Sequence, residues 1–409
     1  MPLPELLAPA GSFACAQAAF DHGADAVYAG IGRFNLRAHS PNFSIQEFAE
    51  LVLYGAKLGR KVYGALNIMP DDQMLQEIRD TLQALSSAKG LPHAFIVSDP
   101  GVVAVVKETC PAVDLHLSTQ TGCFNSSSMN FWRAQGISRI VLPRELSLDR
   151  IKELSLGDIV ETEIFVHGAM CVSISGRCLL GAYLGKRHPN LGDCPQPCRF
   201  KYRIIPQEVG MENPQDGFLL EESQNGVYLL NSKDLCTLDI LPDLVATGTA
   251  SFKIEGRNKS AHYVASVVKV YREALDLYQK DPQNYKVQSW WLAELDSIEH
   301  RPYTTAFYGS DPLKQEVFSS KAQAGYRLVG TVKAVLEGRP VVDVKNSFSS
   351  SEKINVLPVR QQQAPFDILF DGIRNFEGHP MEKAPSNRLV ILSGCDGKLR
   401  TGDMLRISI

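Results

Sequence analysis

The sequence lacks the features that mark membrane, secreted and repeat proteins. No apolar run reaches the roughly 20 residues that a membrane-spanning helix needs. The opening stretch, MPLPELLAPAGS, has neither the basic region nor the apolar region of a signal peptide. No internal repeat, charged tail or long low-complexity segment is visible. These absences argue against a membrane protein and predict a cytoplasmic one.

A large excess of one charge is missing as well. The formal net charge of -3 argues against a surface coated uniformly by nucleic acid, although a local basic patch is compatible with it. The 409 residues are 44% hydrophobic and 21% charged, which is an ordinary globular composition with enough apolar side chains for a large core. A chain of this length is expected to form two domains.

Several common catalytic motifs are also absent. The sequence has no H-E-x-x-H zinc helix, no G-x-S-x-G nucleophile elbow and no phosphate-binding loop. The GIG at 30–32 is too short to be a dinucleotide-binding fingerprint. The chemistry must therefore be read from other patterns.

Short apolar runs alternate with helical patterns over the first 280 residues. Each run is rich in valine, isoleucine, leucine or phenylalanine, as strands buried on both faces are. The runs span 3–11, 24–30, 61–68, 93–99, 113–119, 139–146, 161–168 and 251–256. Helical patterns lie between them, for example at 44–59 and 72–90. Eight β–α units predict a (β/α)8 TIM-type barrel, with an open doubly wound sheet as the alternative.

The pattern changes near residue 280. We expect residues 1–280 to form the barrel, with a cysteine-rich insertion at 169–230. Residues 281–304 are expected to be a linker, and the period-two, turn-rich stretch 305–409 predicts a small antiparallel β-barrel domain. The run 226–232 is either a ninth strand or the return arm of a hairpin in the insertion.

Polar side chains gather at the ends of the predicted strands, where a barrel enzyme places its active site. They are Asn67, Asp99, His116, Ser118, Thr119, Gln120, Arg144, Glu145, His167, Glu255 and Arg257. Any one of them could cap a helix or complete a turn. Together they predict a ligand cavity.

Cysteine is sparse except in one segment. Four of the nine cysteines lie between residues 171 and 198, with the spacing C-x6-C-x15-C-x3-C. They are Cys171, Cys178, Cys194 and Cys198. In a reducing compartment such a cluster indicates metal binding or catalysis rather than disulfide bonds.

The spacing leaves three uses for these thiols. Four of them match the ligand number of an iron–sulfur cluster and of a structural zinc site. Zinc sites usually have two close cysteine pairs, whereas only Cys194 and Cys198 are close here, in a segment that two prolines stiffen. The third use is a single nucleophile, Cys171, with His167 as its base, as in a cysteine peptidase.

The cysteine-rich segment is also basic. One acidic residue, Asp193, faces Arg177, Lys186, Arg187, Arg199, Lys201 and Arg203, and the eighth strand is followed by further cations. A solvated loop face would explain this composition. Otherwise it predicts an anionic partner, either RNA phosphates or a small dicarboxylate.

Several segments resemble the signature of peptidase family U32. They are EIFVHGAMCVSISGRC at 163–178, NLGDCPQPCR at 190–199, NSKDL at 231–235 and FKIEGR at 252–257, together with ELLAPAGS, GADAVYAG and LSTQ. The resemblance runs from the N-terminus to about residue 272. FDGIRNFEGHP and GDMLR resemble, more weakly, the C-terminal β-domain of the family's tRNA-modifying branch. One departure is Gly181, where the family commonly has serine.

The resemblance implies an oxygen-independent hydroxylase, although the family name records an older peptidase attribution. It implies a [4Fe-4S] cluster held by Cys171, Cys178, Cys194 and Cys198, and prephenate as a co-substrate. Cys236, within NSKDLC, is expected to be a helix residue rather than a ligand. The implied activity is conversion of uridine 34 of tRNA to 5-hydroxyuridine.

Other functions are compatible with the same sequence. One is hydroxylation of rRNA or of a quinone precursor. Another is a collagenase-like peptidase that uses His167 and Cys171. A third is an RNA-binding or assembly factor whose cluster is structural.

We assign expected roles on this basis. The predicted catalytic residues are Arg144, His167, Glu255 and Arg257. The predicted substrate-binding residues are Arg37, Asn67, His116, Ser118, Gln120, Arg177 and Lys253. Arg144, Arg257 or Arg37 would hold the carboxylates of a prephenate-like co-substrate through paired hydrogen bonds. Candidates for stacking on an RNA base are Phe34, Phe124 and Tyr183, and the C-terminal domain would contact the RNA backbone.

Overall fold

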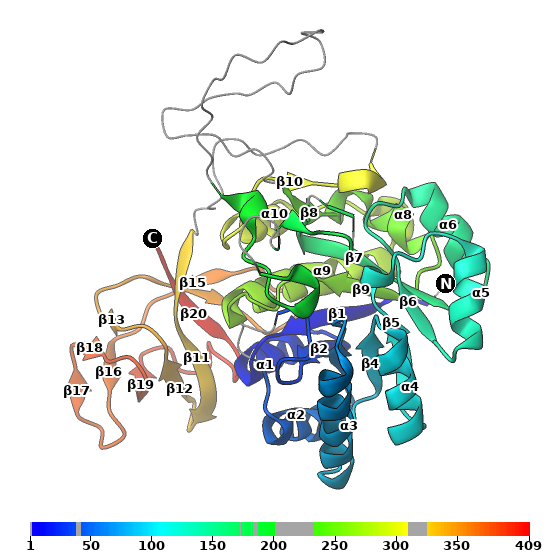
Figure 1. Cartoon of the computed structure of the whole chain (residues 1–409). Helices are drawn as coiled ribbons and strands as arrows, with labels where there is room; N and C mark the ends of the chain where they lie inside the picture. The colour runs from blue at the N-terminus through cyan, green and yellow to red at the C-terminus, as the bar shows by residue number, and fades with distance from the viewer. Residues whose placement is uncertain are drawn as a thin grey trace, which may run out of the picture.

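The structure is a computed structural model of the whole chain. It describes residues 2–37, 42–171, 173–174, 176–180, 182, 187–200, 232–309 and 325–409. Figure 1 shows a barrel surrounded by helices and, beside it, a smaller domain made of strands. Residues 226–231 of the possible ninth strand lie outside the described part of the chain.

Eight parallel strands form the barrel, as the sequence predicted. They are β1 (Glu5–Ala10), β2 (Ala26–Gly30), β3 (Lys61–Leu66), β4 (Ala94–Val97), β5 (Asp114–Leu117), β6 (Arg139–Val141), β7 (Glu161–Ala169) and β9 (Ser251–Ile254). Neighbours in space follow the order of the chain, and β9 pairs in parallel with both β7 and β1. This second pairing closes the ring, so the alternative of an open sheet is wrong.

Helices cover the outside of the barrel (Figure 1). They are α1 (Phe13–Asp21), α2 (Ile45–Lys57), α3 (Asp72–Ser87), α4 (Pro100–Thr109), α5 (Ser126–Ala134), α6 (Leu148–Leu156), α8 (Leu241–Val245) and α9 (Ala261–Lys280). Local sequence sets their starts: Ser44 and Glu47 form a capping box before α2, and the Asp99 side chain accepts from the first backbone N–H groups of α4. Asp99 is thus a helix cap. Among the described residues, no helix is both long and apolar enough to cross a bilayer.

Two short strands that the sequence did not reveal extend the sheet beside β7. β8 (Asp234–Cys236) pairs antiparallel with β7, so that Cys236 lies opposite His167, and β10 (Tyr303–Thr304) pairs in parallel with β8. Cys236 is therefore a strand residue, contrary to the expected helix. Such short strands carry too few residues for a periodic signal.

Residues 281–304 were expected to be a linker, but they pack against the barrel. They contain α10 (Ser289–Asp296), which contacts α9, and Trp291 and Leu295 are buried in the same hydrophobic core as the barrel strands. The polar composition at 281–286 marks only the short connection between the two helices.

The C-terminal domain is built on an antiparallel sheet. In spatial order its strands are β15 (Phe366–Ile368), β14 (Ile354–Leu357), β20 (Met404–Ser408), β11 (Tyr326–Leu336), β12 (Arg339–Val344), β19 (Leu389–Ser393), β16 (Gly372–Arg374) and β17 (Pro380–Met381). A second small sheet joins β13 (Phe348–Ser349) to β18 (Lys383–Ala384). The predicted antiparallel β-domain is confirmed, although within the described residues no pairing joins the outer strands β15 and β17.

A buried ion pair joins the two domains. Arg406 in β20 reaches both carboxylate oxygens of Glu294 in α10 at 2.6 Å, and each side chain is 1% exposed. Ser266 in α9 also donates to Glu294. Since a desolvated, bidentate pair tolerates little displacement, the β-domain is held firmly against the barrel.

Candidate functional site

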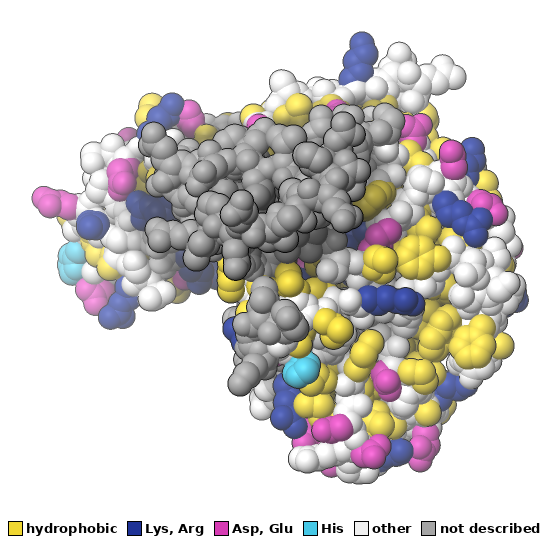
Figure 2. All heavy atoms as spheres, turned by 45° about the horizontal axis from the view of Figure 1, so that its top comes forward, with side chains coloured by type: hydrophobic (Ala, Val, Ile, Leu, Met, Phe, Trp, Pro, Cys, Tyr) yellow, Lys and Arg dark blue, Asp and Glu magenta, His cyan; other side chains and the backbone are white. Residues whose placement is uncertain are grey.

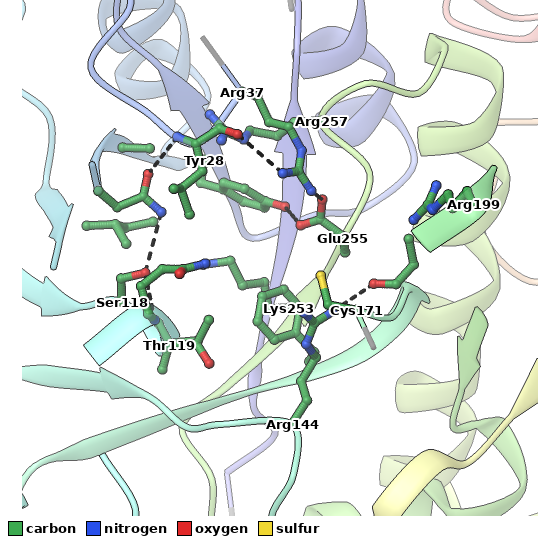
Figure 3. Close-up of a pocket in the computed structure, with 18 residues that line it drawn as sticks. Tyr28, Arg37, Ser118, Thr119, Arg144, Cys171, Arg199, Lys253, Glu255 and Arg257 are labelled. Atoms are coloured by element: carbon green, nitrogen blue, oxygen red, sulfur yellow. Dashed lines mark hydrogen bonds and ion pairs between the residues drawn. The ribbon is translucent and has the colours of Figure 1, made fainter. Parts of the chain in front are cut away.

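A cavity of about 100 Å³ opens at the carboxyl ends of the barrel strands. Its lining comes from strands β2, β3, β4, β6, β7 and β9 and from the loops that follow the strands. Nine of the predicted site residues contribute to it: Arg37, Asn67, Ser118, Gln120, Arg144, Cys171, Lys253, Glu255 and Arg257 (Figure 3). The expectation of a polar cavity at this end of the barrel is therefore met.

Basic side chains dominate the cavity. Among its lining residues one carboxylate, that of Glu255, faces the side chains of Arg37, Arg144, Arg199, Lys253 and Arg257. On the outer surface that Figure 2 shows in colour, by contrast, acidic and basic side chains are interspersed. The excess of basic side chains in the cavity suits an anionic ligand.

The Glu255 carboxylate is held between Arg37 and Tyr28. Arg37 Nη2 lies 3.2 Å from Oε1, and the Tyr28 hydroxyl donates to Oε2 at 3.2 Å. Burial would raise the pKa of Glu255, but Arg37, Arg257 and Arg144 together hold that pKa below its usual value. Burial and the charge of Glu255 raise the pKa of Tyr28 well above its usual value. Glu255 thus stays ionised, and Tyr28 stays a neutral donor.

The Arg257 guanidinium is buried without an ion-pair partner among the described residues. Its residue is 7% exposed, and Nη1 donates to the Asn35 side-chain oxygen at 2.8 Å. Burial, and also the nearby Arg37, lower the pKa of Arg257. A Cβ atom at Gly30 would lie 2.7 Å from Nη1, so the end of β2 makes room for this group only as glycine. A buried cation of this kind is costly unless an anion balances it.

Lys253 forms the floor of the cavity, where its charge is already balanced. Its Nζ lies 2.8 Å from Oε1 of the fully buried Glu163 and 4.4 Å from the centre of the Tyr28 ring. Glu163 also approaches Arg139 at 3.5 Å. Lys253 therefore reaches the cavity as one half of an ion pair rather than as an unpaired cation.

Arg144 and Cys171 lie side by side at the mouth of the cavity (Figure 3). Arg144 Nη1 donates to the Ala169 carbonyl at 2.7 Å, and its guanidinium lies 5.0 Å from the centre of the Phe165 ring. Desolvation by the surrounding protein would raise the pKa of Cys171. The charges of Arg144 and Arg37 and a hydrogen bond from Arg144 more than offset this and lower the pKa. The thiolate form, which binds metals, is therefore more accessible than in an ordinary cysteine.

The other three cysteines of the segment lie near Cys171 but are not arranged as a metal site. Burial raises the pKa of Cys198, and the charges of Cys171, Cys194 and Cys178 raise it further, which places all four thiols in one neighbourhood. Among the described residues, no three Cys, His, Asp or Glu side chains are close enough to hold a metal ion. Convergence of the four sulfurs on one site stays a prediction.

Gly176 determines how closely the cysteine-rich segment approaches the barrel. Its φ is +77°, and a Cβ atom there would lie 2.0 Å from the Gln120 carbonyl oxygen. Both conditions require glycine. Because Gln120 lines the cavity, this close contact brings the segment that carries Cys171 and Cys178 to the cavity's rim.

His167 does not reach the cavity. It is 1% exposed, and its ring centre lies 5.5 Å from that of Tyr271 and 5.4 Å from that of Tyr303. The pairing of β7 with β9 shifts register between Phe165 and His167, and this bulge turns His167 away from the interior that Phe165 faces. Burial lowers the pKa of His167 to about 3. The structure thus places it apart from Cys171, contrary to the expected catalytic base.

Two other predicted substrate-binding residues also lie outside the cavity lining. His116 is 4% exposed and packs against the Tyr63 ring at 4.8 Å, and burial lowers its pKa well below the usual value. Arg177 is exposed and does not contribute to the lining. His116 was predicted from its position near a strand end and Arg177 from the basic composition of its segment, and neither signal specifies where a side chain points.

Neither of the two predicted stacking residues in the described part of the chain lines the cavity. Phe34 is buried in the barrel core, and Phe124 packs against the core. Tyr183 lies outside the described residues, as do Lys186, Lys201 and Arg203 of the basic segment. Of the remaining basic residues, Arg187 pairs with Asp193.

Sequence reasoning missed two residues that shape the cavity. Tyr28 lies within an apolar strand run, and Asn35 follows it in a loop without a motif. The one available signal was the tyrosine itself, because a buried phenol needs a hydrogen-bond partner. In the structure that partner is Glu255, with the Ile254 carbonyl at 3.0 Å as a second acceptor.

Fold and site together define a class: a (β/α)8 barrel protein with a cationic cavity at the mouth of the barrel, a cysteine-rich segment beside that cavity and an attached antiparallel β-domain. The chain belongs to peptidase family U32. The family's sequence profile matches residues 11–317, and the profile of the family's C-terminal domain matches residues 324–406.

Three relatives show the range of names in this family. The chain is 33% identical to tRNA hydroxylation protein P1 of Bacillus subtilis, over 98% of this chain and 94% of the relative. It is 31% identical to a 23S rRNA 5-hydroxycytidine synthase of Escherichia coli, over 87% of this chain and 53% of the relative. It is 28% identical to a collagenase of Porphyromonas gingivalis, over 81% and 83% respectively.

Proposed function

We propose that this protein is an RNA-modifying hydroxylase that acts on tRNA and converts uridine 34 to 5-hydroxyuridine. Similarity to a tRNA hydroxylation protein along nearly the whole chain supports the substrate, and an rRNA hydroxylating relative supports the reaction class. The structural observation that carries the proposal is the cationic cavity beside Cys171. It offers a binding place for an anionic co-substrate next to a thiol whose pKa the arginines lower.

As the co-substrate bound at this cavity we propose a small dicarboxylate such as prephenate. Arg257 offers a buried guanidinium fixed by Asn35, and Arg144 offers a second one at the mouth. A guanidinium binds a carboxylate through two parallel hydrogen bonds. Glu255 holds Arg37 at the rim, and the neutral Tyr28 hydroxyl orients Glu255. In this arrangement the arginines bind the co-substrate, while Glu255 and Tyr28 position the arginines.

The four cysteine thiols have the chemistry that ligands of a [4Fe-4S] cluster need. Four free thiols share one neighbourhood, and arginine charges favour the ionised form of Cys171. Binding would require Cys171, Cys178, Cys194 and Cys198 to draw closer together than they are here. Such a cluster supplies one-electron transfer when bound. The chain would hold the cluster through these cysteines, and the nearby arginines make Cys171 easier to ionise than an ordinary thiol.

The alternative function is the peptidase of the family name. It would require a base next to the Cys171 nucleophile. His167, the candidate for that base, is turned to the outer side of β7, and the groups that most affect Cys171 are arginines. The geometry of the described residues therefore favours the hydroxylase.

The test is mass spectrometry of nucleosides from tRNA and rRNA of cells with and without the gene. We expect 5-hydroxyuridine and its derivatives to disappear from tRNA in the deletion strain and to return with the wild-type gene. Loss of a hydroxylated base from rRNA alone would assign the protein to rRNA. Unchanged nucleosides in both RNAs would contradict the proposal.

A second test concerns the cluster. Cys171→Ala should abolish the visible absorbance of anaerobically prepared protein, because a ligand is lost. Cys395→Ala is the matched control, since Cys395 is buried in the core of the C-terminal domain. Equal absorbance in the Cys171→Ala protein would remove this cysteine from the ligand set.

A further inference from the structure

A second cavity lies on the other side of Arg144 and Cys171. It encloses about 110 Å³ and shares these two side chains with the cationic cavity. Its other lining residues are Glu145, Met170, Ser173, Ile174 and Phe307. Arg144 and Cys171 therefore form a partition between two neighbouring spaces.

The two spaces differ in charge and in polarity. The second cavity has one basic and one acidic side chain, Arg144 and Glu145, and its other walls are mostly apolar. It therefore does not select for an anion. A hydrogen-bond donor and an acceptor beside apolar walls suit an uncharged polar ring.

The wall formed by Phe307 is held in place by its two neighbours. Phe307 is 43% exposed, whereas Ala306 and Tyr308 on either side are 1% and 5% exposed. These three residues form a short 3-10 helix, and Ala306 has the unusual φ of +52° for a residue other than glycine. The Tyr308 hydroxyl donates to the Phe165 carbonyl at 2.9 Å. Since Ala306 and Tyr308 are anchored inward, the Phe307 ring is presented to the cavity.

A backbone conformation of this kind costs free energy, and it persists where the surrounding structure enforces it, frequently at ligand sites. The enforcing contacts here are the Tyr308 hydrogen bond and one from the Ala306 N–H to the Thr304 hydroxyl at 3.0 Å. Thr304 belongs to β10, which Figure 1 shows beside β8 near the mouth of the barrel. An exposed phenylalanine on such a rigid support differs from a solvated loop residue.

We propose that this second cavity receives the target pyrimidine of the RNA, with the base stacked on Phe307. Arg144 donates to a ring carbonyl and Glu145 accepts from a ring N–H. The cavity is smaller than the roughly 300–1,000 Å³ that enclose a whole ligand, so a single ring enters while the ribose and phosphates stay outside. This assignment rests on the proposed RNA hydroxylation and adds the place where the base binds.

The two neighbouring cavities determine where the base and the co-substrate lie relative to Arg144 and Cys171. The pyrimidine and the anionic co-substrate would bind on opposite sides of the partition, each in contact with Arg144 and Cys171. An unpaired anticodon base can enter such a site without the cost of opening a duplex. Stacking of a base on an aromatic side chain is the usual way in which proteins hold unpaired RNA bases.

The experiment uses an anticodon stem-loop RNA with a fluorescent pyrimidine analogue at position 34, titrated with the full-length protein. Wild type should quench the fluorophore by stacking. Phe307→Ala should lose most of the quenching and weaken binding by about tenfold, within the range found for loss of one base stack. Phe307→Tyr keeps the ring and should behave as wild type. The matched control is Phe131→Ala, because Phe131 is 59% exposed on α5 and contributes to neither cavity.

The outcomes separate the two proposals. Quenching by Phe307→Ala equal to wild type, with RNA still bound, would overturn the base site and leave the proposed function standing. Absence of any RNA binding or tRNA modification by wild type would overturn the proposed function and the base site with it. If Phe307→Ala does not fold, Phe307→Leu makes the same comparison, since it keeps apolar contact and removes the ring.

Discussion

The interior of the barrel has two charged layers that are built differently. In the lower layer, Arg139 contacts Glu5 at 2.7 Å and Glu163 at 3.5 Å, and Glu163 also pairs with Lys253 at 2.8 Å. Each buried charge in this layer has an opposite charge next to it. In the upper layer, at the mouth, the one ion pair that Glu255 forms with a described residue is with Arg37.

The two layers differ in whether their buried charges are balanced, and this difference indicates a structural role for one layer and a binding role for the other. Buried ion pairs with complete partners can hold a fold together, although their net contribution to stability is small. Arg257 of the upper layer has an amide oxygen as its partner and no carboxylate within ion-pair distance among the described residues. Since arginine cannot lose its proton, the imbalance persists until an anion binds. The balanced layer supports the barrel, and the unbalanced layer is suited to an anionic ligand.

The largest expected effect is loss of stability in the lower layer. Glu163→Gln leaves Lys253 and Arg139 with less compensating charge, and we expect the free energy of unfolding to fall by about 3–5 kcal/mol. Arg257→Met, in the upper layer, should leave that free energy unchanged or slightly raised, because it removes an unbalanced charge. Urea unfolding of both variants measures the contrast. Equal losses would remove the distinction between the layers.

His167 provides the second test. A buried histidine, unlike a buried arginine, can become neutral by losing its proton. The pKa is about 3 in the folded protein and has an ordinary value of 6.5 when exposed. Between these values the unfolded chain binds the proton and the folded protein does not. The free energy of unfolding therefore has its full value, as far as His167 is concerned, above pH 6.5. It falls with decreasing pH, by about 2 kcal/mol at pH 5.

His167→Phe should remove that part of the pH dependence while filling the same aromatic cluster. Chemical denaturation between pH 7 and pH 4 measures it, and the variant should lose less stability than wild type over this range. His22 and His262 have pKa values that burial lowers to about 4, so some acid sensitivity should remain. An acid limb identical to that of wild type would show that His167 is not the group that titrates.

Arg257→Lys tests the upper layer with a smaller expected effect on the free energy of unfolding. Lysine keeps the charge but loses the planar pair of hydrogen-bond donors. Activity at a limiting concentration of the dicarboxylate co-substrate should therefore fall by about tenfold or more, which corresponds to about 1.4 kcal/mol of transition-state stabilisation. Melting temperature and cluster absorbance should stay near wild type, and excess donor should restore part of the rate. Arg139→Lys is the control in the lower layer, with reduced stability and an unchanged donor response. Full activity of Arg257→Lys across the donor titration would disprove the carboxylate contact.

The smallest expected effect on global stability comes from Gly176→Ala. The added methyl group would clash with the Gln120 carbonyl and also strain a positive φ, so the cysteine-rich segment should separate from the barrel. Limited proteolysis should cut this segment faster, while the urea midpoint of the barrel stays within error of wild type. Gly59→Ala is a suitable control, because it has a positive φ but nothing within 4 Å of the added atom. Equal proteolysis of the two variants would contradict the docking role.

The barrel could be predicted from the sequence because each strand is a separate apolar run between helical patterns. The short β8 and β10 could not, since two or three residues carry no period. Strand-end position placed Arg144 and Arg257 around a cavity, as the structure has them. It failed for His167, because a β-bulge within β7 reversed the direction of that side chain. The Phe307 site depends on a turn at Ala306 that has no sequence signal.

The most direct test of the account is reconstitution with the purified, cluster-loaded protein under anaerobic conditions. The protein is incubated with unmodified tRNA and with or without prephenate, and the nucleosides are then analysed by mass spectrometry. We expect one added oxygen on uridine 34 only when the dicarboxylate is present, and little product from Arg257→Lys at limiting dicarboxylate. Hydroxylation that is equally fast without any dicarboxylate would contradict the central claim that the unbalanced arginine cavity binds the co-substrate.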